Sequence, residues 1–260
     1  MKFMVKQETS KNVQDKKQVQ ALYDSFAQQY TRNYLNPTSL FGLEKQQRLK
    51  IVRHHLQELQ PRSVLDLGCG PGYTTSMVAS DLSNATVVGV DFSPEMIEVA
   101  RQNHSQMAFF LQGDAENLPF ESKRFSAIFA LGLLEKFENP LYTLTECYRA
   151  LIPGGHLYFT YPNRFSFLRI FHRWIGSFLG ENTGVQDQSM FSGEGMRRIL
   201  NQVGFKVLEI TFLTYGNGFI LFPWSEKIDL VMEKHLGKNN FGRAISMTSF
   251  WSLQKTPPVV

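Results

Sequence analysis

The stretch SVLDLGCGPGYTT, residues 63–75, joins an apolar run to an abrupt break. Val64, Leu65 and Leu67 surround one aspartate, and three glycines and a proline then follow within five residues. An apolar run bounded by turn residues is typical of a strand that is buried on both faces. Glycines directly after such a strand either form a tight structural turn or allow the backbone to approach a ligand closely.

Strands and helices alternate on both sides of this stretch. Further apolar runs predict strands at 85–91, 107–114, 125–132, 155–161, 205–213 and 244–255. The pairs Ser93–Pro94 and Asn139–Pro140 place a capping residue before a proline, which is a typical helix start. This alternation predicts a mostly parallel, doubly wound sheet with helices on both faces.

Composition excludes several classes of protein. The chain has 260 residues and a net charge of +4, with acidic and basic residues intermixed. We expect no nucleic acid partner, because nucleic-acid binders cluster their basic residues. The two cysteines form no regular framework, which favours a reducing compartment. No apolar run fits a signal peptide or a membrane span, so we expect a cytoplasmic protein without a transmembrane segment.

An aspartate ends each of the first three predicted strands, at Asp66, Asp91 and Asp114. Open parallel sheets bind their ligands at the carboxyl ends of the strands. One aspartate at such a place usually caps a turn, but three beside a glycine loop indicate a binding site. A dinucleotide is one candidate ligand. Its G-x-G-x-x-G fingerprint, however, requires a third glycine where this chain has Tyr73.

Three segments resemble the successive cofactor motifs of class I S-adenosylmethionine-dependent methyltransferases. They read VLDLGCGPG, VVGVDFSPEMIEVA and GDAENLPF, in the family's order and spacing. The similarity covers about residues 20–162 and 190–213, and the most similar branch contains ubiquinone- and menaquinone-pathway and natural-product enzymes. It implies an α/β fold with a Rossmann-like, mostly parallel seven-stranded sheet, an S-adenosyl-L-methionine cofactor and a small-molecule acceptor.

The resemblance also implies a single methyltransferase domain over residues 1–260. We expect it to contain a helical lid, a cofactor-binding core and two substrate-cap insertions, at 1–60, 61–162, and 163–191 with 214–243. Tyr23 and Tyr30 resemble lid tyrosines that relatives close over the cofactor. The alternative is an aromatic helix stripe packed on the core.

Residue roles follow from the three motifs. Asp91 can accept hydrogen bonds from both ribose hydroxyls, as the acidic residue of dinucleotide folds does. By resemblance, Asp114 accepts from the adenine amino group, and Asp66 lies near the amino end of the methionine part. The backbone of Ala115, with Phe92 and Met96, would contact the adenine. The full set of implied cofactor contacts is Tyr23, Tyr30, Asp66, Gly68, Cys69, Gly70, Asp91, Phe92, Met96, Asp114, Ala115 and Leu131.

The chain departs from the family pattern after the fourth strand. Relatives often read LEH there, whereas this chain reads LEKF, with Lys136 at the histidine position. Glu135 remains as a polar group near the acceptor side, with helix capping as its alternative role. No histidine, Ser/His/Asp set or metal-ligand spacing stands out. The sequence therefore assigns no catalytic residue and no metal.

Two aromatic segments outside the motifs are expected to select the acceptor. Phe167, Phe171 and Trp174 lie on one apolar face of a predicted helix, opposite basic residues, and Phe222 and Trp224 lie in the second insertion. Three interpretations of the helix stay open. It packs on the sheet edge as a lid, lines a pocket for a hydrophobic substrate, or makes peripheral contact with a membrane surface.

We therefore expect S-adenosylmethionine-dependent methyl transfer to oxygen, nitrogen or carbon of a small apolar or amphiphilic metabolite. One alternative is an RNA or protein methyltransferase. Amino-methylating, base-flipping enzymes place a side-chain amide and a stacking ring after the fourth strand, whereas this chain reads ALGLLEKF at 130–137. Another alternative is a cofactor-binding subunit without catalytic activity.

Overall fold

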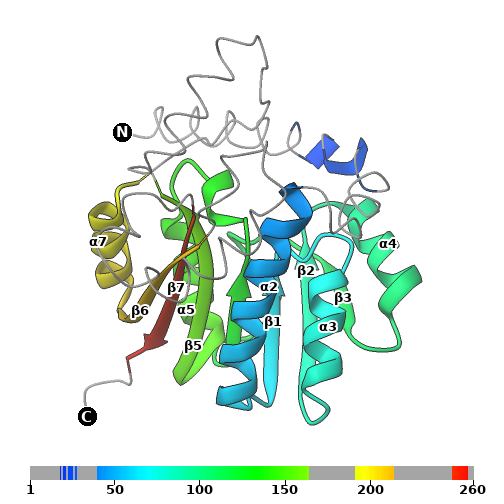
Figure 1. The fold of residues 1–260 in the computed structure, drawn as a ribbon, viewed down its shortest axis with the longest axis horizontal. Helices are drawn as coiled ribbons and strands as arrows, with labels where there is room; N and C mark the ends of the chain where they lie inside the picture. The colour runs from blue at the N-terminus through cyan, green and yellow to red at the C-terminus, as the bar shows by residue number, and fades with distance from the viewer. Residues whose placement is uncertain are drawn as a thin grey trace.

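The computed structural model describes residues 40–163, 191–213 and 248–256, together with residues 18, 20, 21, 23–25 and 27. Within these residues seven strands form one sheet, in the order β3-β2-β1-β4-β5-β7-β6 (Figure 1). The strands are β1 (Ser63–Leu67), β2 (Thr86–Asp91), β3 (Phe109–Gln112), β4 (Phe125–Ala130), β5 (Leu151–Pro162), β6 (Phe205–Leu213) and β7 (Thr248–Lys255).

Strand direction divides the sheet into two parts. The pairs among β1 to β5 are parallel, whereas β7 runs antiparallel to both β5 and β6. The chain order reverses between β1 and β4, which are neighbours in the sheet although two strands separate them in sequence. This arrangement confirms the predicted doubly wound, mostly parallel seven-stranded sheet. It also brings the carboxyl ends of β1 and β4 together, where such folds bind ligands.

The helices pack in two layers (Figure 1). They are α2 (Leu40–Leu59), α3 (Tyr73–Asp81), α4 (Pro94–His104), η1 (Leu134–Lys136), α5 (Leu141–Ala150) and α7 (Gly193–Val203). One buried cluster joins α2, α3 and α4 to the sheet, and a second joins α5 and α7 to it. Successive residues of β1 point to opposite faces, so Val64 enters the first cluster and Leu65 the second.

Helix ends follow local chemistry. Ser93 Oγ accepts from the Met96 N–H at 3.1 Å and caps α4, as predicted. The start of α5 lies one residue later than predicted, because Pro140 takes the cap position. Asn139 Oδ1 still accepts from the Leu141 N–H at 3.1 Å.

Candidate functional site

The glycine loop turns sharply away from β1 and is held against β2. The N–H groups of Gly68 and Cys69 both donate to the Val90 carbonyl, at 2.8 and 3.0 Å. Gly68, Gly70 and Gly72 have φ angles of 77°, 52° and 82°. Residues other than glycine rarely adopt this left-handed backbone conformation, so the turn itself requires glycine at these positions.

Space around the loop adds a second requirement. A Cβ at Gly72 would lie 2.8 Å from the Phe110 ring and 2.9 Å from Ala100 Cβ. A Cβ at Gly68 would lie 3.0 Å from Leu133 Cδ1. The two interpretations of the opening stretch are therefore not exclusive, because the turn needs glycine and also leaves backbone at the ligand-binding edge of the sheet.

Asp91, the last residue of β2, joins the glycine loop to the start of α4. Its Oδ2 accepts from the Gly70 N–H at 2.8 Å, and its Oδ1 accepts from the Ser93 N–H at 3.0 Å. Burial raises the pKa of Asp91, while these backbone donors act against the rise. A carboxylate has about four acceptor positions, so both oxygens retain capacity for a ligand.

Asp66, in β1, is more deeply buried than Asp91. The strand continues one residue beyond it, to Leu67, so Asp66 is the penultimate residue of β1 and not its end. Its Oδ2 accepts from the Thr75 hydroxyl of α3 at 2.6 Å. Burial raises the pKa of Asp66 to about 7, against the effect of the Thr75 hydrogen bond. Neighbouring Cys69 is buried and free, and burial raises its thiol pKa well above the ordinary value.

Asp114 stands in a turn beyond the third strand, because β3 ends at Gln112 and not at 114 as predicted. Its Oδ1 accepts from the Glu116 N–H at 2.9 Å. Ala115, between them, is buried. The turn therefore holds Asp114 just after the end of β3, as backbone donors hold Asp91 at the end of β2.

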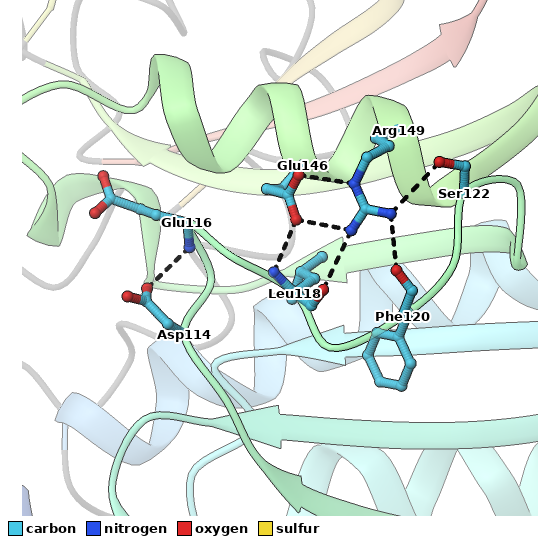
Figure 2. A network of polar contacts seen from close by, with 7 residues as sticks. All are labelled: Asp114, Glu116, Leu118, Phe120, Ser122, Glu146 and Arg149. Carbon is cyan, nitrogen blue, oxygen red and sulfur yellow. Dashed lines mark hydrogen bonds and ion pairs between the residues drawn. The ribbon is translucent and has the colours of Figure 1, made fainter.

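Helix α5 fastens the chain that follows this turn (Figure 2). Glu146 Oε2 accepts from the Leu118 N–H at 2.8 Å. Arg149 pairs with Glu146 at 2.8 Å and donates to the Leu118 and Phe120 carbonyls at 3.2 and 2.7 Å. The Arg149 guanidinium holds the pKa of Glu146 below its usual range. This anchor was not predicted from the sequence, although an acid and a base at i, i+3 on a helix are a signal for it.

The described N-terminal residues are helical and lie above the carboxyl ends of the strands, near the start of α4 (Figure 1). Ser93 Oγ donates a short hydrogen bond to Asp24 Oδ1. Asp24 also raises the pKa of exposed Glu95 through a side-chain hydrogen bond. Tyr23, the preceding residue, is half-buried. Asp24, in the predicted lid segment, is thus hydrogen-bonded to Ser93, whose N–H also donates to Asp91.

The other predicted site residues divide by exposure. Met96 is fully buried, whereas Phe92 and Leu131 are half-buried. Six predicted residues lie outside the described ranges: Tyr30, Phe167, Phe171, Trp174, Phe222 and Trp224. Their roles stay predictions.

The connection after β4 forms the other side of this edge. Gly132 has a φ of 75°, and its N–H donates to Thr160 Oγ1 of β5 at 2.9 Å. Glu135 follows in η1 and is buried, whereas Lys136, at the family's histidine position, is half-buried. This connection therefore contains one buried carboxylate and no histidine.

A family model described as a methyltransferase domain matches residues 65–159. A demethylmenaquinone methyltransferase of Thermus thermophilus is 31% identical over 214 residues, which cover 75% of this chain and 96% of the relative. The chain belongs to the class I S-adenosylmethionine-dependent methyltransferases, in the branch that acts on small molecules. This confirms the resemblance carried by the three motifs, and with it S-adenosylmethionine as the cofactor.

One further relative and one solved structure are also similar to this chain. A demethylmenaquinone methyltransferase of Bacteroides fragilis is 27% identical over 220 residues, which cover 76% of this chain and 89% of the relative. The solved structure of magnesium protoporphyrin IX methyltransferase from Synechocystis, with bound SAM, shares the fold with a TM-score of 0.62 at 15% identity. It covers 93% of this chain and 97% of that chain.

The residues at this edge fit the cofactor's chemistry. S-adenosylmethionine has a ribose diol, an adenine amino group and a methionine amino group, all of which donate hydrogen bonds to carboxylates. It has no phosphates, and the loop has no third glycine of the dinucleotide type. The aspartates at the ends of the strands and a glycine turn that exposes backbone match these groups.

Two further features are absent from the residues that the structure describes. No group of three or more His, Cys, Asp or Glu side chains there could hold a metal ion. None of the helices in the same ranges combines the length and apolar character needed to cross a bilayer.

Proposed function

We propose that the protein transfers a methyl group to a small apolar or amphiphilic acceptor of the quinol type, such as the reduced form of demethylmenaquinone. The similarity to demethylmenaquinone methyltransferases extends over about three quarters of the chain and supports this acceptor class. In this proposal the aromatic segments at 164–179 and 219–224 wall the acceptor pocket, with Phe167, Phe171, Trp174, Phe222 and Trp224 in contact with the apolar body.

The proposed cofactor site uses the carboxyl ends of β1, β2 and β3. The main support is the geometry of Asp91. The backbone N–H groups of Gly70 and Ser93 donate to its two carboxylate oxygens, at 2.8 and 3.0 Å. We assign the ribose diol to Asp91, the adenine amino group to Asp114 and the amino end of the methionine part to Asp66. The backbone of the loop contacts the cofactor at Gly68, Cys69 and Gly70. The adenosine is surrounded by Phe92, Met96, Ala115 and Leu131.

The chain's residues supply positioning in this reaction. When bound, the cofactor supplies a methyl group on a positively charged sulfur, which is a good leaving group. Asp91 and the glycine loop orient the donor, and the buried surroundings exclude water, which together provide much of the acceleration.

The proposed division of the domain adds a lid at 1–60 and cap insertions at 163–191 and 214–243 around the core at 61–162. The link from Asp24 to Ser93 supports the lid, with Tyr23 and Tyr30 over the cofactor. Deletion of residues 1–35 should abolish turnover and leave the sheet folded. Circular dichroism measures whether the sheet stays folded, and the activity assay measures turnover. Full activity of the truncated protein would exclude the lid.

We also infer a cytoplasmic location, with peripheral contact to the membrane where prenylated quinones reside. The buried free thiols of Cys69 and Cys147 support a reducing compartment. Binding to lipid vesicles with and without the 164–179 segment tests the membrane contact.

The deciding experiment is a methyl-transfer screen with labelled cofactor. Demethylmenaquinol, simple phenols, fatty acids and RNA serve as acceptors under reducing conditions. We expect preferential labelling of the quinol. Preferential labelling of RNA, or of hydrophilic metabolites only, would exclude the proposed acceptor class.

A further inference from the structure

Glu135 is a buried carboxylate beyond the carboxyl end of β4. Its exposed fraction is 6%, and its Oε2 atom has no hydrogen-bond partner among the residues that the structure describes. A buried carboxylate oxygen without a donor destabilises the folded state. Such a group in a native protein requires an explanation, and binding of a substrate is one.

Its position connects Glu135 to both halves of the site. A methyl group placed on Gly132 would lie 3.7 Å from Glu135 Oε1 and 2.6 Å from Arg48 Nη1 of α2. Leu133, between Gly132 and Glu135, approaches Gly68 so closely that a Cβ there would lie 3.0 Å from Leu133 Cδ1. The connection with Glu135 therefore touches the glycine loop of the proposed cofactor site.

From this arrangement we propose that Glu135 binds the acidic hydroxyl of the methyl acceptor and takes the proton that the acceptor loses. This proposal rests on the proposed function. Methyl transfer breaks the bond from sulfur to the methyl carbon, and the electron pair stays on sulfur. An electron pair of the acceptor forms the new bond to the methyl carbon. When the hydroxyl oxygen is methylated, its O–H bond breaks and the Glu135 carboxylate receives that proton. When a ring carbon is methylated, Glu135 receives the hydroxyl proton, and the proton lost from that ring carbon returns to the oxygen.

The same carboxylate selects among acceptors. A quinol or phenol hydroxyl donates a hydrogen bond to Glu135 and thereby satisfies the buried oxygen. A fatty acid brings a second negative charge to the same place, where two carboxylates repel each other. Arg48 Nη1 also lies near this position. Its positive charge reduces the repulsion between the two carboxylates but does not give the bound fatty acid a proton to share with Glu135. Glu135 thus favours acceptors with a proton to donate.

The test compares Glu135→Gln with Glu138→Gln, which removes the same charge from an exposed position three residues later. With demethylmenaquinol as the probe, Glu135→Gln should lower kcat roughly 100-fold or more, since general bases contribute about that much. The affinity for the demethylated cofactor product, measured by calorimetry, should not change. Glu138→Gln should change none of these.

Two further probes separate this proposal from the proposed function. A halogenated naphthoquinol, whose hydroxyl is more acidic, should lose less turnover in Glu135→Gln than demethylmenaquinol does. In the presence of the demethylated cofactor product, Glu135→Gln should bind a fatty acid more tightly than the wild type does. If the wild type labels a phenol and not the quinol, the proposed acceptor is wrong, and the phenol then serves for the same comparison.

Two results would overturn the role of Glu135. One is a kcat of Glu135→Gln within about threefold of wild type, far from the effect of a lost general base. The other is a lowered thermal midpoint with a parallel loss of cofactor-product affinity, which would indicate a structural carboxylate.

Discussion

At the carboxyl ends of β1, β2 and β3, each aspartate accepts hydrogen bonds from its own chain, whereas Glu135 beyond β4 keeps one oxygen without a donor among the described residues. Thr75 holds Asp66, two backbone N–H groups hold Asp91, and one holds Asp114. In the proposed site, the aspartates of the cofactor half are therefore already held by donors of the protein itself. In our proposal, the acceptor half keeps one carboxylate oxygen to which the substrate donates a hydrogen bond.

The largest expected effect concerns Asp66 and the dependence of stability on pH. Burial raises its folded pKa to about 7, whereas an unfolded aspartate titrates near about 3.9. The folded state holds the proton more tightly, so this stability is complete below about pH 4 and is lost as the pH rises to about 7. The loss amounts to about 4 kcal/mol at most, from about 1.4 kcal/mol per pH unit.

Asp66→Asn should remove this dependence, because asparagine keeps an acceptor for Thr75 and does not ionise. Urea unfolding of both proteins without cofactor measures the difference. The advantage of the variant should grow from about pH 4 to about pH 7 and then stay constant. A difference that does not vary with pH would show that Asp66 is as well accommodated when charged as when neutral.

A second experiment asks whether the cofactor half is rigid because of its packing. Gly72→Ala should cost about 3 kcal/mol of stability, since its Cβ meets the Phe110 ring and Ala100 in a left-handed backbone. Gly154→Ala is the matched control, with a φ of 76° and no atom within 4 Å of the new Cβ. It should cost only about 1 kcal/mol. Equal losses in thermal unfolding would remove the packing argument.

A third experiment tests whether the pre-formed carboxylates bind the cofactor. Asp91→Ala should weaken S-adenosylmethionine binding by about 1–3 kcal/mol, because ribose hydroxyls and two backbone donors lose their acceptor. Glu98→Ala, at an exposed position of α4, is the control. Calorimetry measures both affinities. Wild-type affinity in Asp91→Ala would exclude the ribose assignment.

The smallest expected effect concerns the proposed lid. Asp24→Ala removes the hydrogen bond to Ser93 and should weaken cofactor binding by about 0.5–1.5 kcal/mol. Amide hydrogen exchange in the N-terminal helix should become faster, whereas exchange in α4 should not. Asp24→Asn, which retains an acceptor, should behave nearly as the wild type does. Unchanged exchange in Asp24→Ala would mean that other contacts hold the helix.

Local patterns predicted much of the cofactor half. The glycines, the Ser93 cap and the aspartates after successive strands each depend on a few neighbouring residues, so the sequence alone shows them. The partners of Asp91 are different in kind. Gly70 reaches it only because β1 and β2 pair in the register Leu67 with Val90. A pattern along the chain does not contain that register.

The acceptor half was harder to predict for the same reason. Whether Glu135 caps a helix or stays unpaired depends on what packs around it, namely Gly132 and Arg48 from another element. The anchor between Glu146 and the connection after Asp114 likewise needs α5 to lie under that connection. Composition identified the aromatic segments, but no local pattern states which side of the sheet they face.

Strand β7 has a consequence for synthesis on the ribosome. It pairs with β5 on one side and β6 on the other, although it follows both in the chain. While residues 214–247 are being translated, β6 has no sheet neighbour and β5 has an open edge, and open edges invite association with other chains. When β7 arrives, Lys255 donates to the Tyr148 and Leu151 carbonyls at 2.6 and 2.8 Å and fixes the strand in place. Expression that stalls or stops before Thr248 should therefore yield aggregates.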